Sequence, residues 1–144
     1  MATINTYLNF NGNCEKAFNF YKAIFGGEFT YLGYFKDMPE SEDCKIDDED
    51  KNKIMHVSLP IGHSILMGSD TAGQQQDQFN QGNNFSISIT ADSKLEADTM
   101  FQKLSVDGHK IMPLEDTFWG DYFGMLVDKF GIQWMISYNK NSIK

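Results

Sequence analysis

The sequence of 144 residues contains no arginine, and its twelve basic side chains are all lysines set against twenty acidic residues. The formal net charge is −8, and no basic face suited to a nucleic-acid backbone is visible. Without guanidinium groups the chain also lacks the bidentate clamp that proteins use for carboxylates and phosphates. We therefore expect no nucleic-acid partner and no arginine-based anion site.

Long apolar runs and cysteines are also scarce. The apolar segments are far shorter than the roughly 20 residues that span a membrane, and polar residues interrupt positions 1–20, where a signal peptide would need an apolar stretch. Cys14 and Cys44 are the only cysteines, in a chain large enough to fold without disulfides. We predict reduced thiols, a cytoplasmic location and no membrane partner.

The residues that are present predict a folded protein with one unusual segment. Hydrophobic residues make up 41% of the chain and aromatic residues 14%, enough for a packed core. Eight acids are concentrated in one segment: Asp37, Glu40, Glu42, Asp43, Asp47, Asp48, Glu49 and Asp50. Their spacing lacks the glycine and the distributed ligands of a calcium loop. The composition predicts a solvated surface loop, and a role as a lid or as a docking site for a basic partner stays open.

Two helical patterns recur at a constant offset of 80 residues. Apolar residues at i, i+3, i+4 and i+7 predict one buried helix face in each half. The matched pairs are Ala17 with Ala97, Phe20 with Met100, Tyr21 with Phe101, and Ile24 with Leu104. Gly26 and Gly27 end the first helix, and Ser93 with Glu96 forms a capping box that begins the second.

Strand patterns complete each half as β-α-β-β-β. The expected strands are residues 1–10, 29–36, 54–59 and 64–69 in the first half, and 85–90, 110–118, 122–127 and 132–138 in the second. Residues 71–83, rich in Gln, Gly and Asn, predict an exposed linker. The fold prediction is a single α+β domain over residues 1–144, with modules 1–70 and 84–140 on either side of this linker.

Short motifs along nearly the whole chain carry a family resemblance. They include Leu8-Asn9-Phe10-Asn11-Gly12-Asn13, Met55-His56-Val57-Ser58-Leu59, Phe118-Trp119-Gly120-Asp121-Tyr122-Phe123-Gly124 and Asp128-Lys129-Phe130-Gly131-Ile132-Gln133-Trp134. Together they resemble the PhnB-like branch of the vicinal-oxygen-chelate superfamily, which includes glyoxalase I, bleomycin-resistance proteins and extradiol dioxygenases. One departure is Lys129, where the branch usually has a proline. The resemblance implies two βαβββ modules whose mixed sheet curls around a cleft, and a homodimer.

The resemblance also implies a divalent metal in that cleft, held by His, Gln or Glu on the first and last strands of the modules. The corresponding positions here fall at about Thr6, Ser86 and Met135, with Leu66 or Met67 on the fourth strand. Hydroxyls are weak ligands, and thioethers prefer soft metals. We therefore predict no metal of the superfamily type and no other cofactor.

The candidate ligand-binding residues are one histidine and a set of aromatic and acidic side chains. His56 alternates with apolar residues in a strand, where it is either a polar group of the cleft or a hydrogen-bonded structural histidine. The second cluster is Trp119-Gly120-Asp121-Tyr122-Phe123-Gly124. Its aromatic side chains either wall one end of the cleft or fill the core or a dimer interface. The predicted site consists of His56, Trp119, Asp121, Tyr122, Phe123 and Tyr34.

These observations predict a PhnB-like protein that binds a small apolar or aromatic molecule in its cleft. One alternative is a divalent-metal lyase or dioxygenase with an atypical site that includes His56. Another is a protein-interaction module that uses the acidic loop. The sequence leaves open the identity of the ligand and whether any reaction is catalysed.

Overall fold

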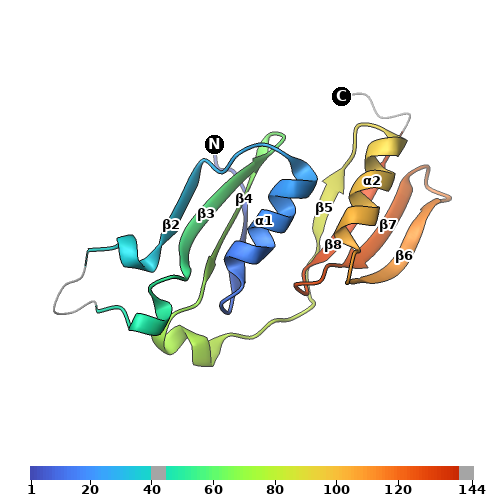
Figure 1. Cartoon of the computed structure of the whole chain (residues 1–144). Coiled ribbons are helices and arrows are strands. Elements are labelled where there is room, and N and C mark those ends of the chain that lie inside the picture. Colours follow the sequence, from blue (N-terminus) through green and yellow to red (C-terminus); the bar gives the residue numbers. More distant parts are fainter. Residues whose placement is uncertain (40–44, 140–144) are drawn as a thin grey trace. The chain divides into compact units, whose positions relative to one another are not determined.

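A computed structural model describes residues 1–39 and 45–139 and folds them into two compact units (Figure 1). The boundary between the units lies at Asn80/Gln81, inside the predicted linker. We call Met1–Asn80 the first module and Gln81–Lys144 the second module. Within the described ranges, no helix is both long enough and apolar enough to cross a membrane.

The first module is a four-stranded sheet with one long helix. Its elements are β1 (Thr6–Phe10), α1 (Cys14–Phe25), β2 (Tyr31–Tyr34), β3 (Ile54–Ile61) and β4 (Ser64–Asp70). Three short 3₁₀ helices add to them: η1 (Phe35–Asp37), η2 (Asp48–Asp50) and η3 (Gly73–Gln78). The strand order is β1-β4-β3-β2, with β1 parallel to β4 and the other neighbours antiparallel.

The second module repeats this plan. Its elements are β5 (Ile87–Thr90), α2 (Lys94–Leu104), β6 (His109–Asp116), β7 (Tyr122–Val127) and β8 (Gln133–Tyr138). The strand order is β5-β8-β7-β6, again with one parallel and two antiparallel pairs. The predicted α+β fold of two βαβββ modules with mixed sheets is confirmed.

In the first module, α1 lies across the sheet (Figure 1) and buries Cys14, Ala17, Phe18 and Tyr21. The predicted face is therefore partly wrong, because Phe18 occupies the core while Phe20 and Ile24 are only half-buried. Gly68 of β4 makes the close contact possible: a β-carbon at that position would lie 2.6 Å from the Phe18 ring.

In the second module, α2 buries all four predicted residues, Ala97, Met100, Phe101 and Leu104. Gly124 of β7 has the same role as the glycine under α1, since a β-carbon there would lie 2.9 Å from the Phe101 ring. Each helix therefore packs an aromatic ring against a glycine of its sheet, and each sheet keeps its other face free of its helix.

The two helices begin in different ways. Ser93 accepts a hydrogen bond from the Glu96 backbone N–H at 3.0 Å, as the capping-box motif predicts. Asn13, in the equivalent place before α1, makes no side-chain cap. Instead Asp70, at the end of β4, accepts hydrogen bonds from the backbone N–H groups of Gly12, Cys14 and Ile54, each at 2.9 Å. One buried carboxylate thus ties together the start of α1, the end of β4 and the start of β3.

The acidic segment is not a uniformly solvated loop. Asp50 is only 2% exposed and accepts hydrogen bonds from Lys53 Nζ (2.7 Å), Gln76 Nε2 (2.9 Å) and the Gly73 backbone N–H (3.2 Å). The Lys53 hydrogen bond is the main cause that lowers the pKa of the Asp50 carboxyl. The prediction of a solvated loop is therefore wrong at Asp50.

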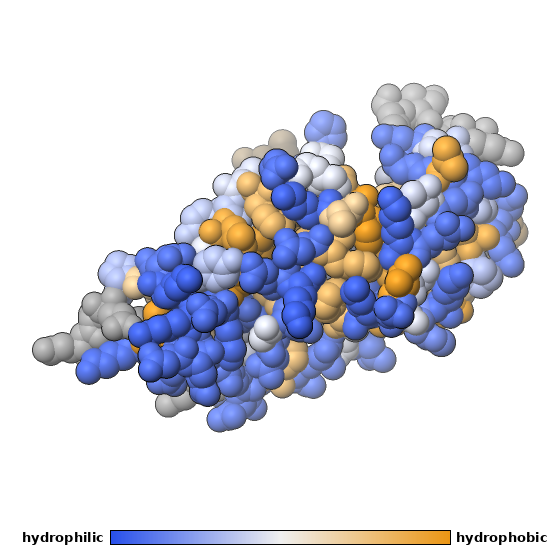
Figure 2. Space-filling model, in the orientation of Figure 1, coloured by the Kyte–Doolittle hydropathy of each residue, from blue (hydrophilic) through white to orange (hydrophobic). Residues whose placement is uncertain are grey.

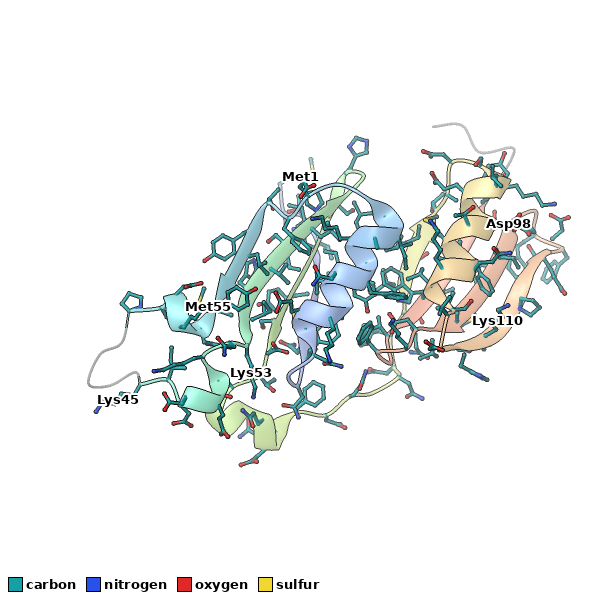
Figure 3. The ribbon with its side chains drawn as sticks, viewed as in Figure 1. Met1, Lys45, Lys53, Met55, Asp98 and Lys110 are labelled. Atoms are coloured by element: carbon teal, nitrogen blue, oxygen red, sulfur yellow. The ribbon has the colours of Figure 1, made fainter. Side chains whose placement is uncertain are left out.

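Other acids of this segment fit the prediction or fall outside the described ranges. Asp48 is exposed and pairs with Lys51 at 3.0 Å. Hydrophilic residues crowd the surface where η2 and η3 lie (Figure 2), and Lys53 projects from the turn between η2 and β3 (Figure 3). Outside the described residues lie Glu40, Glu42 and Asp43.

Cys14 is buried and its thiol forms no disulfide, and burial raises the pKa of this thiol. Cys44 lies outside the described residues.

Candidate ligand-binding site

The sheet face that α1 leaves free carries a continuous row of side chains. We call it the open face of the first module. Directly paired residues on neighbouring strands point to the same side of a sheet. The register joins Tyr7 to Met67, Met67 to Ser58, and Ser58 to Tyr31, so one row crosses all four strands. We call these four residues the tyrosine row.

His56 lies beside this row, on the same strand as Ser58 and two residues before it. Its Nε2 is 2.9 Å from Ser58 Oγ, and its Nδ1 is 3.3 Å from the Tyr7 hydroxyl. The rings of Tyr7 and Tyr31 have their centroids 5.6 Å and 5.7 Å from the imidazole centroid. The histidine is therefore held by hydroxyl groups at both nitrogens and has an aromatic ring on each side.

Gly33 explains how the Tyr31 ring reaches the histidine. Gly33 is paired with His56 across β2 and β3. A β-carbon at Gly33 would lie 2.7 Å from the Tyr31 hydroxyl oxygen and 2.9 Å from its Cε1. The Tyr31 side chain thus lies along its own strand over a glycine, and a larger residue there would push the ring away.

The electrostatics of this cluster are simple. Within residues 1–39 and 45–139, no carboxylate or ammonium group forms a hydrogen bond or an ion pair with His56. Tyr7 is 42% exposed and Tyr31 48% exposed. In the same described ranges the Tyr31 hydroxyl has no hydrogen-bond partner. The cluster therefore offers hydroxyl and imidazole groups with two half-exposed rings, which suits a flat molecule that carries a hydrogen-bond acceptor.

Tyr34, also predicted for the site, is engaged elsewhere. Its hydroxyl donates a hydrogen bond to Glu15 Oε2 in the first turn of α1, on the covered side of the sheet. This hydrogen bond is the main cause that raises the pKa of Tyr34. The pairing of β2 with β3 shifts between Gly33 and Tyr34, so simple alternation along the strand does not place Tyr34 beside His56. A role in ligand contact stays a prediction.

The second predicted cluster forms the hairpin between β6 and β7. Asp121 accepts hydrogen bonds from Trp119 Nε1 (3.0 Å) and Asn139 Nδ2 (2.7 Å), so its carboxylate is used to hold the hairpin. The Trp119 ring is 5.9 Å from the Phe123 ring and is 51% exposed. Trp119 and Phe123 therefore form an aromatic pair at this end of the second module.

Tyr122 has an internal role. Its hydroxyl donates a hydrogen bond to Asp98 of α2, and Lys94 Nζ lies 4.7 Å from its ring centroid. The hydrogen bond to Asp98 is the main cause that raises the pKa of Tyr122 to about 12. The contact joins α2 to β7, as the hydroxyl of Tyr34 joins β2 to α1.

The open face of the second module, the one that α2 leaves free, carries a different row. The register joins Ser88 to Met135, Met135 to Met125, and Met125 to Met112. We call this the methionine row. Phe123 lies two residues before Met125, in the place that His56 takes beside the tyrosine row. This row offers three thioethers and one hydroxyl, whereas the tyrosine row offers three hydroxyls and one thioether.

The positions that the resemblance assigns to a metal do not fit a hard divalent cation. Thr6 pairs with Leu66, and Met135 pairs with Ser88. Hydroxyl and thioether groups at these positions are poor ligands for such an ion. Among the described residues, one group of acids comes close enough to share a cation: the ligand atoms of Asp47, Glu49 and Asp50 lie within 4.8 Å of one another. The carboxylate oxygens of Asp50 already accept hydrogen bonds, so we assign no metal to this group.

Comparison with known proteins places the chain in a family. The family profile described as 3-demethylubiquinone-9 3-methyltransferase matches residues 2–137. The chain belongs to this family. Its fold is that of the glyoxalase/bleomycin-resistance/dioxygenase superfamily: structures at 16–17% identity from Burkholderia phytofirmans and Fulvimarina pelagi superpose with TM-scores of 0.59 and 0.62. The resemblance to the PhnB-like branch is thereby confirmed.

More similar relatives support the assignment. Protein PA1353 from Pseudomonas aeruginosa is 38% identical, with a TM-score of 0.82 over 96% of this chain and 98% of that one. A PhnB protein from Bacillus cereus, described as a putative 3-demethylubiquinone-9 3-methyltransferase, is 26% identical with a TM-score of 0.75 over 95% of this chain and 99% of that one. Protein YjdN of Escherichia coli (strain K12) is 30% identical over 93% of each chain.

Sequence reasoning found His56 but missed its neighbours. The polar alternation of β1 and β2 shows that Tyr7 and Tyr31 occupy one face of their own strands. It does not show that the parallel pairing of β1 with β4 and the antiparallel pairing of β2 with β3 bring the two rings beside His56. The combination of Tyr31 with a glycine two residues later was the one local signal of a ring laid along its strand.

Proposed function

We propose that the protein binds a small aromatic molecule on the open face of its first module. The observation that carries this proposal is the arrangement around His56: two half-exposed tyrosine rings flank an imidazole whose nitrogens face hydroxyl groups. Aromatic rings provide contact area at a low cost in side-chain entropy, and the polar groups fix the orientation of a bound ring.

The competing explanation is that His56 stabilises the sheet. Two features favour binding. Both tyrosine rings are half-exposed, and the Tyr31 hydroxyl has no partner among the described residues. Side chains that only stabilise a sheet are expected to be buried with their polar atoms paired, whereas these leave ring surface and one hydroxyl open to a ligand. Comparison with the family supports the fold and leaves the ligand open, so the ligand class comes from these side chains.

A thermal-shift screen tests the proposal. The panel contains neutral, acidic and basic aromatic molecules, and each is measured with the wild-type protein, His56→Gln and the control His63→Gln, whose histidine is exposed on the β3–β4 turn. At least one compound should raise the melting temperature of the wild type and of His63→Gln by several degrees, and that of His56→Gln much less. A panel without hits, or hits unchanged in His56→Gln, would contradict the proposal.

A further inference from the structure

We infer that the ligand of this face is an aromatic weak acid, bound as its anion against a protonated His56. This inference rests on the proposed function and narrows it from aromatic molecules to anionic ones. It starts from the side chains that face the imidazole from each neighbouring strand.

These neighbours contain no fixed charge. Tyr7 faces the imidazole from β1, Tyr31 from β2 and Ser58 from its own strand β3, while β4 contributes Met67 to the row. None of them is a carboxylate or an ammonium group. A carboxylate brought to this face would therefore meet no negative side chain in the cluster, and an ammonium group would meet none that could neutralise it.

An imidazole ring can carry one proton or two, and the ring with two protons is charged. When the ring is neutral, one nitrogen lacks a proton, and either the Tyr7 or the Ser58 hydroxyl must donate to it. When the ring is protonated, both nitrogens donate to the hydroxyl oxygens, and both hydroxyl protons become available to another acceptor. Protonation thus adds a positive charge and frees one further donor.

The Tyr31 hydroxyl completes the arrangement. It has no partner in the described part of the chain, and its ring lies 5.7 Å from the imidazole. An anion in front of His56 can accept hydrogen bonds from this hydroxyl and from that of Tyr7 while its own ring lies against theirs. Hydrogen bonds to a charged acceptor are about twice as strong as neutral ones, so the donors favour an anion over a neutral analogue.

Isothermal titration with two probes of nearly the same shape tests the inference. The probes are 2-naphthoate and the neutral 2-naphthalenemethanol, each titrated at about pH 5.5 and about pH 8, on either side of the range in which histidine changes charge. Naphthoate stays ionised at both pH values, so a change in its affinity comes from the protein. We expect naphthoate to bind at least about tenfold more weakly at the higher pH, and the alcohol to bind weakly and equally at both.

Three variants sharpen the result. His56→Gln keeps hydrogen-bonding groups without the charge and should remove the pH dependence, while His63→Gln should retain it. Tyr31→Phe keeps the ring and should weaken naphthoate binding about fivefold, with little effect on the alcohol. Circular dichroism confirms that each variant is folded.

The other outcomes separate the two proposals. If the alcohol binds as tightly as naphthoate, or naphthoate binding does not depend on pH, the anion inference is wrong and aromatic binding stands. If His63→Gln loses the pH dependence and His56→Gln keeps it, the inference is also wrong. If neither probe binds and the thermal-shift panel has no hit, both proposals fail.

Discussion

The two modules share one backbone plan and differ in what they place on the open face. The first module carries Tyr7, Ser58 and Tyr31 around Met67 and sets His56 beside them. The second carries three methionines in a row with Ser88 and sets Phe123 in the place of the histidine. The covered faces are alike, since an aromatic ring of each helix meets a glycine of each sheet.

This difference indicates where the chemistry of the protein lies. Residues under the helices are constrained by close packing and therefore resemble one another in the two modules. Open-face residues are free of that constraint, so a histidine with hydroxyl partners on one module only points to a task that the other does not share. The methionine row offers soft, adaptable apolar surface instead.

We expect the largest loss of stability from changes at the buried carboxylate that anchors each module. Asp70→Asn should lower the free energy of unfolding by about 2–4 kcal/mol, because the amide cannot accept all three backbone hydrogen bonds of the buried carboxylate. Hydrogen exchange should quicken in α1 and β3 while α2 keeps its protection.

Asp128→Asn provides the matched variant in the second module, where the carboxylate accepts from the Phe130 and Ile132 N–H groups and from Trp134 Nε1. Its effect on hydrogen exchange should appear around β7 and β8. If either variant lost hydrogen-exchange protection equally in both modules, the two carboxylates would not stabilise their modules independently.

The next largest effect is a loss of stability of the first module at acidic pH. The lowered pKa of Asp50 means that its ionised form stabilises the fold above the unfolded-state pKa of about 3.9, and that this contribution is lost as the pH falls through the lower folded-state value. Asp50→Asn should cost about 1–2 kcal/mol at neutral pH and less at about pH 2. Urea unfolding at the two pH values measures this, and an equal cost at both would exclude the linkage.

A smaller effect is a loss of stability of the second module at alkaline pH. The pKa of Tyr122 is raised to about 12, so its contribution is complete below the unfolded-state value of about 10 and is lost as the pH rises through the folded value. Tyr122→Phe should lower the unfolding free energy by about 1 kcal/mol at neutral pH. Ultraviolet titration should show one fewer late-titrating tyrosine in this variant; an unchanged titration curve would contradict the assignment.

The smallest expected change in stability comes from Gly33→Ala. The added methyl group meets the far end of the flexible Tyr31 side chain, which can move, so the unfolding free energy should change by less than about 1 kcal/mol. Binding on the open face should nevertheless weaken several-fold, because the ring leaves its place beside His56. Calorimetry with 2-naphthoate measures the effect, and unchanged affinity would show that Tyr31 does not contact the ligand.

The sequence predicted much of the fold because periodicity reports directly on burial. Ala97, Met100, Phe101 and Leu104 repeat at helical spacing, and all four are buried. The same reasoning misplaced the centre of the α1 face, because the fit of Phe18 depends on Gly68, which lies 50 residues away in the sequence. The pattern of apolar residues within a helix does not show where a glycine of the opposing sheet leaves space for a ring.

The site was predictable only in part for the same reason. His56 stood out as a polar residue in an apolar strand, but its partners Tyr7 and Tyr31 come from strands whose pairing the sequence does not specify. Composition also failed at Asp50, since burial of an acid depends on donors such as Lys53 and the backbone of Gly73. The spacing of residues along the chain predicts helices and strands. Which side chains meet in the site depends on contacts between strands that are distant in the sequence.

The central claim, that binding belongs to the tyrosine row rather than the methionine row, can be tested directly by NMR of methyl-labelled methionine. Met67 reports on the first open face, and Met112, Met125 and Met135 report on the second. On addition of 2-naphthoate, we expect a shift of the Met67 methyl resonance that saturates with the ligand, while the other three resonances stay unchanged. Saturable shifts of Met112, Met125 and Met135 with a silent Met67 would contradict it.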